Sequence, residues 1–97
     1  MARPPALSSD DVTTALAALP LWAGDEQGIE RRLELPSFRA AVDAVAAIAD
    51  VAEEMDHHPD LDVRWRTLRV AVVTHSAGGV TELDLELARR VDALFPG

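Results

Sequence analysis

Residues 53–84, EEMDHHPDLDVRWRTLRVAVVTHSAGGVTELD, carry the pattern that decides the fold of this 97-residue chain. Pro59 follows His57 and His58, and proline moves the residue before it out of the helical region, so a helix arriving from upstream is expected to end there. Beyond it, the positions that share one face of an alternating pattern are Leu61, Val63, Trp65 and then Leu68, Val70, Val72, Thr74. Two alternating runs separated by a short turn predict the strands of a hairpin.

All three histidines of the chain fall within this stretch. An antiparallel hairpin returns the end of its second strand to the start of its first, so His75 is expected near His57 and His58. Imidazole has an ordinary pKa of about 6.5 and can give or accept a proton at neutral pH. Three imidazoles drawn together therefore predict an acid–base site.

Two other kinds of site compete with this interpretation. Zinc could be held by the three imidazoles with Glu53, Glu54 or Asp56, but adjacent histidines point in different directions and Pro59 prevents the i, i+4 pairing of zinc-binding helices. A serine hydrolase is disfavoured because Ser76, next to His75, lacks the glycine pattern of a nucleophile elbow. The acid–base site remains the favoured prediction.

The spacing within residues 53–84 resembles that of the pterin-4a-carbinolamine dehydratase family. Its signature has an acidic residue, His-His-Pro, an aromatic residue, a third histidine and an aspartate, which correspond here to Glu53, His57, His58, Pro59, Trp65, His75 and Asp84. The segment AGGVTELDLELA at residues 77–88 and the early Trp22 also resemble the family. The similarity covers nearly the whole chain.

The resemblance implies dehydration of 4a-hydroxytetrahydrobiopterin, the carbinolamine left when an aromatic amino-acid hydroxylase has used its pterin, to the quinonoid dihydropterin. It implies substrate contacts from Asp56, His57 and His58 at the helix end and from Thr74, His75 and Ser76 at the strand end. We expect His57 and His75 to transfer protons and His58 to position the pterin, without a metal or a redox cofactor. The residues with an implied supporting role are Glu53, Trp22, Trp65 and Asp84.

Some of these residues also have structural interpretations. Trp22 is either an anchor of the core or a wall of the pterin site, Glu53 suits a solvated helix face, and Asp84 suits the first turn of a helix. Relatives of the family also act as protein-binding modules, either as a dimerisation cofactor of a transcription factor or as assembly factors of a carbon-fixing enzyme. The complete histidine set favours the enzyme.

Composition limits the kind of partner. The formal net charge is −8, with nine arginines and no lysine, which disfavours nucleic acid as a direct partner. The chain has no cysteine and no basic-then-apolar leader, so we expect a cytoplasmic protein, and no apolar run approaches the roughly 20 residues of a membrane span. We expect residues 1–7 to be a flexible leader and residues 8–97 to form one domain.

Periodicity and capping signals give the order helix, strand, strand, helix, strand, strand, helix. Ser8 or Ser9 is expected to cap the first helix, Ser37 the second, and Thr81 the third, in a capping box with Asp84. Leu21 and Trp22 are expected to open the first strand, residues 24–28 to form a loop, and the strand after it to run through residues 29–35.

Hairpins are antiparallel, so the predicted fold is α+β, with a single four-stranded antiparallel sheet and three helices packed on one face. Such a sheet leaves two edges and one face uncovered, so we expect a homo-oligomer, with a dimer favoured over a tetramer. Its interface is expected to include strand residues and to lie apart from the histidines.

Overall fold

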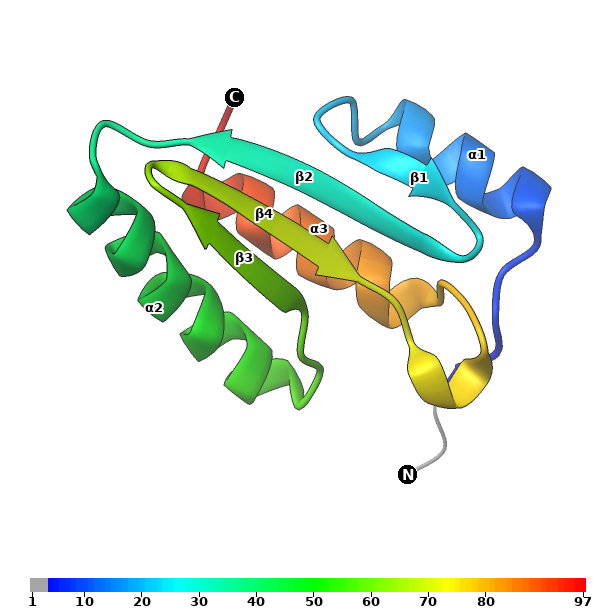
Figure 1. Ribbon diagram of the computed structural model, residues 1–97. Helices are drawn as coiled ribbons and strands as arrows, with labels where there is room; N and C mark the ends of the chain where they lie inside the picture. Colours follow the sequence, from blue (N-terminus) through cyan, green and yellow to red (C-terminus); the bar gives the residue numbers. More distant parts are fainter. Residues whose placement is uncertain (1–3) are drawn as a thin grey trace.

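The computed structural model describes residues 4–97 and follows the predicted order of elements (Figure 1). The elements are α1 (Ser9–Ala17), β1 (Ala23–Asp25), β2 (Gly28–Glu34), α2 (Phe38–Met55), β3 (Asp60–Arg64), β4 (Thr67–Val72), the short 3-10 helix η1 (His75–Ala77) and α3 (Glu82–Leu94). None of the described helices is long and apolar enough to cross a membrane.

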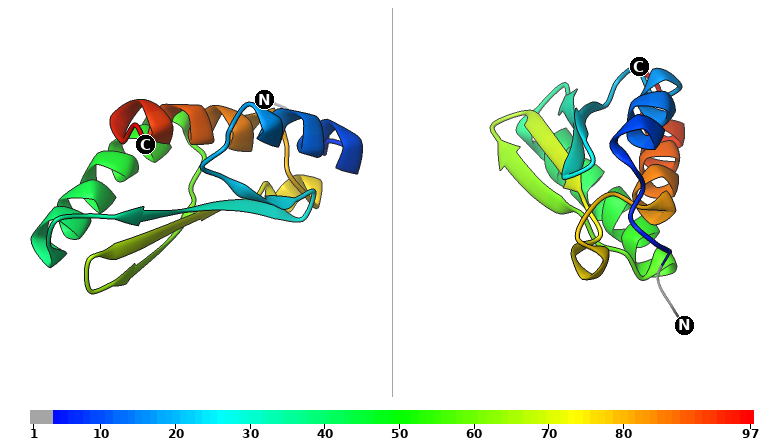
Figure 2. Two further views of the ribbon diagram at one scale, coloured as in Figure 1. Left: turned by 90° about the horizontal axis from the view of Figure 1, so that it is seen from above. Right: turned by 90° about the vertical axis from the view of Figure 1, so that its right-hand side faces the viewer.

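The four strands form one antiparallel sheet in the order β1-β2-β4-β3. The β2–β4 pairing, which runs from Ile29 opposite Val72 to Glu34 opposite Thr67, joins the two hairpins in the middle of the sheet. The helices gather on one side of the sheet (Figure 2). The predicted α+β class, with three helices on one face of a four-stranded sheet, is therefore confirmed.

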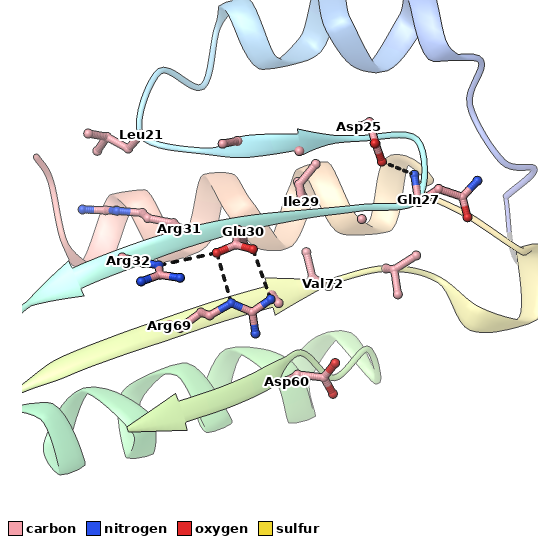
Figure 3. A pocket seen from close by; sticks show the side chains of 15 residues that line it. Leu21, Asp25, Gln27, Ile29, Glu30, Arg31, Arg32, Asp60, Arg69 and Val72 are labelled. Carbon is pink, nitrogen blue, oxygen red and sulfur yellow. Dashed lines mark hydrogen bonds and ion pairs between the residues drawn. The ribbon is translucent and has the colours of Figure 1, made fainter. Parts of the chain in front are cut away.

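Alternation along the strands separates a core face from an open face. On β4, Leu68, Val70 and Val72 are buried and pack with Ile29 of β2 and Ile48 of α2. The intervening residues of β2 and β4 include Glu30 and Arg69, which face away from the helices (Figure 3). The open face thus carries a charged pair, in which Arg69 forms two hydrogen bonds to Glu30.

The predicted helix caps are observed. The side chain of Ser8, rather than that of Ser9, accepts from the backbone N–H of Asp11 in α1, and Ser37 accepts from Ala40 in α2. At α3, Thr81 and Asp84 form the predicted capping box. These side chains satisfy backbone donors that have no partner within the first turn of a helix.

The first hairpin differs from the prediction at both strands. Trp22 does not open β1, because its N–H donates to the Leu19 carbonyl in the turn that follows α1, and β1 begins at Ala23. Gly24 and Gly28 belong to the strands rather than to a loop, which leaves a two-residue turn. Gly24 has a φ of +140°, and a Cβ there would lie 2.1 Å from the Gly28 carbonyl oxygen, so the close pairing requires glycine.

Two further boundaries differ. The strand predicted to reach His75 ends at Val72, since Thr74 makes only an isolated bridge with Gly79, and His75 opens η1 instead. Within the predicted leader, the backbone N–H of Leu7 donates to the Val80 carbonyl and its side chain packs on the core. Leu7 thus joins the domain, whereas residues 1–3 lie outside the described part of the chain.

Candidate active site

The end of α2 directs the two neighbouring histidines to opposite sides. Asp56 adopts the left-handed conformation (φ 49°, ψ 43°), and the N–H of His57 donates back to the Ala52 carbonyl. This closes the last turn, and Pro59 prevents the helix from continuing. The chain reverses here, so that His57 is buried whereas His58 is exposed.

His57 contacts a fully buried carboxylate. Its Nε2 lies 2.6 Å from Oδ1 of Asp84, which is the third residue of α3, and only 6% of the histidine is exposed to solvent. The N-terminal turn of a helix favours a negative charge, since unpaired N–H groups and the helix dipole point toward it. Asp84 therefore serves both as a cap of α3 and as the partner of His57.

Two threonines complete this buried cluster. Oδ2 of Asp84 accepts from the backbone N–H of Thr81 and from the Thr74 hydroxyl, each at 2.8 Å. The two threonine hydroxyls also lie 2.8 Å apart. Thr81 is a member of the cluster that sequence reasoning identified only as a cap, although the Thr-x-x-Asp spacing already placed its hydroxyl beside Asp84.

His58 has a different environment. Its Nε2 lies 2.5 Å from Oε2 of Glu53, and both side chains are more than half exposed. The pair spans the last turn of α2 and joins two residues of the predicted signature, its acidic residue Glu53 and its second histidine, His58. Because water competes at such an exposed pair, the contact orients His58 rather than stabilising the fold appreciably.

His75 lies across a shallow concavity of about 240 Å³ from the helix end. The residues that line it are Asp56, His57, His58, Val73, Thr74, His75 and Ser76. All six residues expected to contact substrate are therefore brought to one place, together with Val73, which no motif had indicated. The hydroxyl of Thr74 is bonded to Asp84, so a substrate contact from this residue would fall to its backbone.

The tryptophans lie elsewhere. Trp22 is buried, and its indole N–H donates to Oδ1 of Asp92 at 2.9 Å, two turns along α3 from Asp84. Trp65 lies in the β3–β4 turn with φ 55°, is 73% exposed and stacks against the Arg66 guanidinium. Neither lines the concavity, and the observed environment of Trp22 corresponds to a core anchor.

Among residues 4–97, no group of three or more His, Cys, Asp or Glu side chains is arranged to hold a metal ion. The geometry explains this, because Nε2 of His57 and Nε2 of His58 are directed to Asp84 and Glu53 on opposite sides of the chain. The two imidazoles therefore have separate hydrogen-bond partners, one buried and one exposed.

A larger concavity of about 580 Å³ lies on the open face of the sheet (Figure 3). Arg69 forms two hydrogen bonds to Glu30, and Arg32 approaches the same carboxylate at 3.6 Å. The hydrogen bond from Arg69 lowers the pKa of Glu30 below its ordinary value. No histidine is among the described residues that line this concavity, and its charges neutralise one another, so it offers less acid–base chemistry than the histidine site.

Fold and site together define a small α+β protein with an imidazole-lined polar concavity at the junction of a helix end and a strand end. The family model for pterin 4 alpha carbinolamine dehydratase matches residues 5–94. The chain belongs to this family.

Individual relatives agree along almost their whole length. The chain is 46% identical over 89 residues to a Mycolicibacterium smegmatis protein provisionally named pterin-4-alpha-carbinolamine dehydratase, covering 92% of this chain and 95% of that protein. A similarly named protein of Mycobacterium tuberculosis H37Rv is 44% identical with the same coverage. A crystal structure of a transcriptional coactivator/pterin dehydratase from Brucella melitensis matches with a TM-score of 0.84 and 34% identity, covering 91% of this chain and 96% of that one.

Proposed function

We propose that this protein is a hydro-lyase that dehydrates 4a-hydroxytetrahydrobiopterin to the quinonoid dihydropterin and water, and so recycles the pterin of aromatic amino-acid hydroxylases. Membership of the family supports the reaction. The observation that carries the proposal is the concavity in which His57, His58 and His75 meet.

The chemistry requires two proton transfers. The C–O bond at the 4a carbon breaks as a C=N bond forms to the neighbouring ring nitrogen, which loses its proton, and the departing hydroxide takes up a proton to become water. A positioned acid and a positioned base each accelerate such a step by about two to four orders of magnitude. We assign these transfers to His57 and His75, and the positioning of the pterin to His58.

The three environments support this division. His57 is held in place by Asp84, as a catalytic base must be. The side chain of His75 is exposed, and its ring has no hydrogen-bond partner among the described residues, which leaves the ring available to substrate. His58 is oriented through Glu53 at the rim. Asp56, the backbone of Thr74 and Ser76 supply further polar contacts around the concavity.

The direct test is a coupled phenylalanine hydroxylase assay that follows loss of the carbinolamine absorbance. The wild-type protein should accelerate the decay, and His57→Ala and His75→Ala should each lower turnover by about two to four orders of magnitude. Arg39→Ala is a matched control, because Arg39 lies in the first turn of α2, roughly 25 Å along the helix from its site end. Wild-type-like turnover of both histidine variants would show that these residues do not transfer the protons.

A second candidate function is a protein-binding module. The Brucella melitensis protein is described as a transcriptional coactivator as well as a pterin dehydratase. A non-catalytic role would be favoured if the purified wild-type chain failed to accelerate carbinolamine loss. Because all three histidines are present at the site, we favour the enzyme over the non-catalytic binding module.

We also infer that the protein is a homo-oligomer, more readily a dimer than a tetramer, and retain the cytoplasmic location as a prediction from the sequence. Strand β3 lies at an edge of the sheet, and β2 extends past β1, so unpaired backbone groups remain at both sides. Phe38, Val42 and Trp65 are large apolar side chains that are exposed in the single chain. A partner copy would cover such surface.

A further inference from the structure

The hydrogens of the buried cluster around Asp84 can be assigned from their donors. Two backbone N–H groups can only donate, that of Thr81 to Oδ2 of Asp84 at 2.8 Å and that of Leu83 to the Thr81 hydroxyl oxygen at 3.2 Å. They fix the two ends of a chain of hydrogen bonds. The threonine hydroxyls between them each carry a single hydrogen.

The order of donation follows. The hydroxyl of Thr74 donates to Oδ2 of Asp84, so its only hydrogen is used there. The 2.8 Å contact between the two hydroxyls must then be a donation from Thr81 to Thr74. Every link runs in one direction, from Leu83 through Thr81 and Thr74 to Asp84, and no buried side-chain nitrogen or oxygen in the described part of the chain lacks a partner.

This arrangement uses both carboxyl oxygens of Asp84 as acceptors. Oδ2 already accepts two hydrogen bonds, and the carboxyl group is fully buried at the N-terminal turn of α3. Unpaired N–H groups of a first helical turn point toward an acceptor in this position. A carboxylate only accepts, so the hydrogen in the 2.6 Å contact with Oδ1 belongs to Nε2 of His57.

The other ring nitrogen of His57, Nδ1, makes no contact with Asp84. Nδ1 has no hydrogen-bond partner among the described residues, and no fully buried side-chain nitrogen there lacks one, so Nδ1 is not fully buried. The concavity that His57 lines is the surface onto which it opens. In neutral imidazole, the nitrogen opposite the N–H carries a lone pair that can accept a proton.

We propose that Asp84, Thr74 and Thr81 act as positioning residues that hold His57 as its Nε2–H tautomer, which makes Nδ1 the proton acceptor of the site. The proposal deepens the function proposed above and rests on it for the identity of the substrate. Nδ1 takes the proton from the ring N–H beside the 4a carbon while the C–O bond breaks. His75 gives the departing hydroxide the proton that completes water, and solvent later returns both histidines to their starting states.

Replacing Asp84 by asparagine should reverse the tautomer. The Thr81 N–H and the Thr74 hydroxyl both need an acceptor, so the side-chain oxygen of asparagine must occupy the Oδ2 position. Its NH₂ group then faces Nε2 of His57, which has to become the acceptor while Nδ1 takes the hydrogen. The capping bond to Thr81 survives, so the fold is expected to persist while turnover falls by about two to four orders of magnitude.

Nuclear magnetic resonance of protein labelled with ¹⁵N in histidine tests this without substrate. Only three imidazoles contribute, and His58→Gln and His75→Gln variants assign the remaining signal to His57. Nε2–H in the wild type and Nδ1–H in Asp84→Asn support the proposal. Nδ1–H in the wild type, or an unchanged tautomer in Asp84→Asn, overturns it.

A matched pair at Thr74 gives a second test should Asp84→Asn unfold. Thr74→Ser keeps the hydroxyl that donates to Asp84 and should retain the Nε2–H tautomer of His57, whereas Thr74→Val keeps the shape and removes the donor. We expect turnover of the valine variant to fall about tenfold or more below that of the serine variant, with similar Michaelis constants. Equal turnover and the same tautomer in the two variants would contradict the proposal. If the tautomers behave as expected but wild-type protein does not accelerate carbinolamine loss, the positioning cluster stands and the proposed function fails.

Discussion

Asp92→Ala should destabilise the protein without disabling the site, because Asp92 anchors the buried Trp22 away from the concavity. Oδ1 of Asp92 accepts from the Trp22 indole N–H at 2.9 Å and from Nη1 of Arg31 at 2.6 Å. Arg31 is 6% exposed and Asp92 is 23% exposed. The variant therefore leaves a nearly buried guanidinium and a buried indole N–H without their shared acceptor.

The expected magnitude follows from burial. Removing one partner of a fully buried ion pair costs about 3–5 kcal/mol, and a buried donor left without its acceptor costs about 1–3 kcal/mol. Water can reach the position of Asp92 and partly replace it, so we expect a loss of about 2–3 kcal/mol. For a domain of this size, that loss lowers the melting temperature by about 10–15 °C.

Thermal unfolding followed by circular dichroism, at matched protein concentration, measures this loss. Arg64→Ala is the control, since the exposed Arg64–Asp62 pair should contribute little. Dehydratase turnover of Asp92→Ala, measured well below its melting temperature, should remain within a few-fold of wild type. An unchanged melting temperature would refute the argument that Asp92 anchors Trp22. A folded but inactive variant would instead support a role of Trp22 as a wall of the pterin site.

Further predictions concern metal, assembly and pH. Exhaustive chelation and dialysis should leave dehydratase activity intact. If activity were lost and only zinc restored it, the three histidines would have to be zinc ligands. Light scattering coupled to size exclusion at micromolar concentration should give an oligomer mass, and a fully active monomer would contradict the argument from exposed edges and apolar side chains. The lowered pKa of Glu30 means that its pairing with Arg69 stabilises the fold above the ordinary value of 4.5 and is lost as the pH falls through the folded-state value. Denaturant unfolding of wild type and Glu30→Gln should therefore differ at pH 7 and converge at strongly acidic pH, whereas a constant difference would exclude this linkage.

The sequence alone determined the order of elements, the hairpin pairing and the place where the histidines meet. These follow from signals that act over a few residues. Alternation defines a strand, Pro59 ends a helix, and Ser37 or Thr81 starts one by satisfying backbone donors within its first turn. The meeting of His57 with His75 needed only the further fact that a hairpin returns beside its own start.

The tertiary structure decided what each of those side chains does. Adjacent histidines of identical chemistry separate into a buried one and an exposed one because the left-handed Asp56 and the position of α3 fix which side faces the core. The partner of His57 lies 27 residues away and that of Trp22 lies 70 residues away. Burial and such distant hydrogen bonds depend on how the whole chain packs, and no local pattern contains that information.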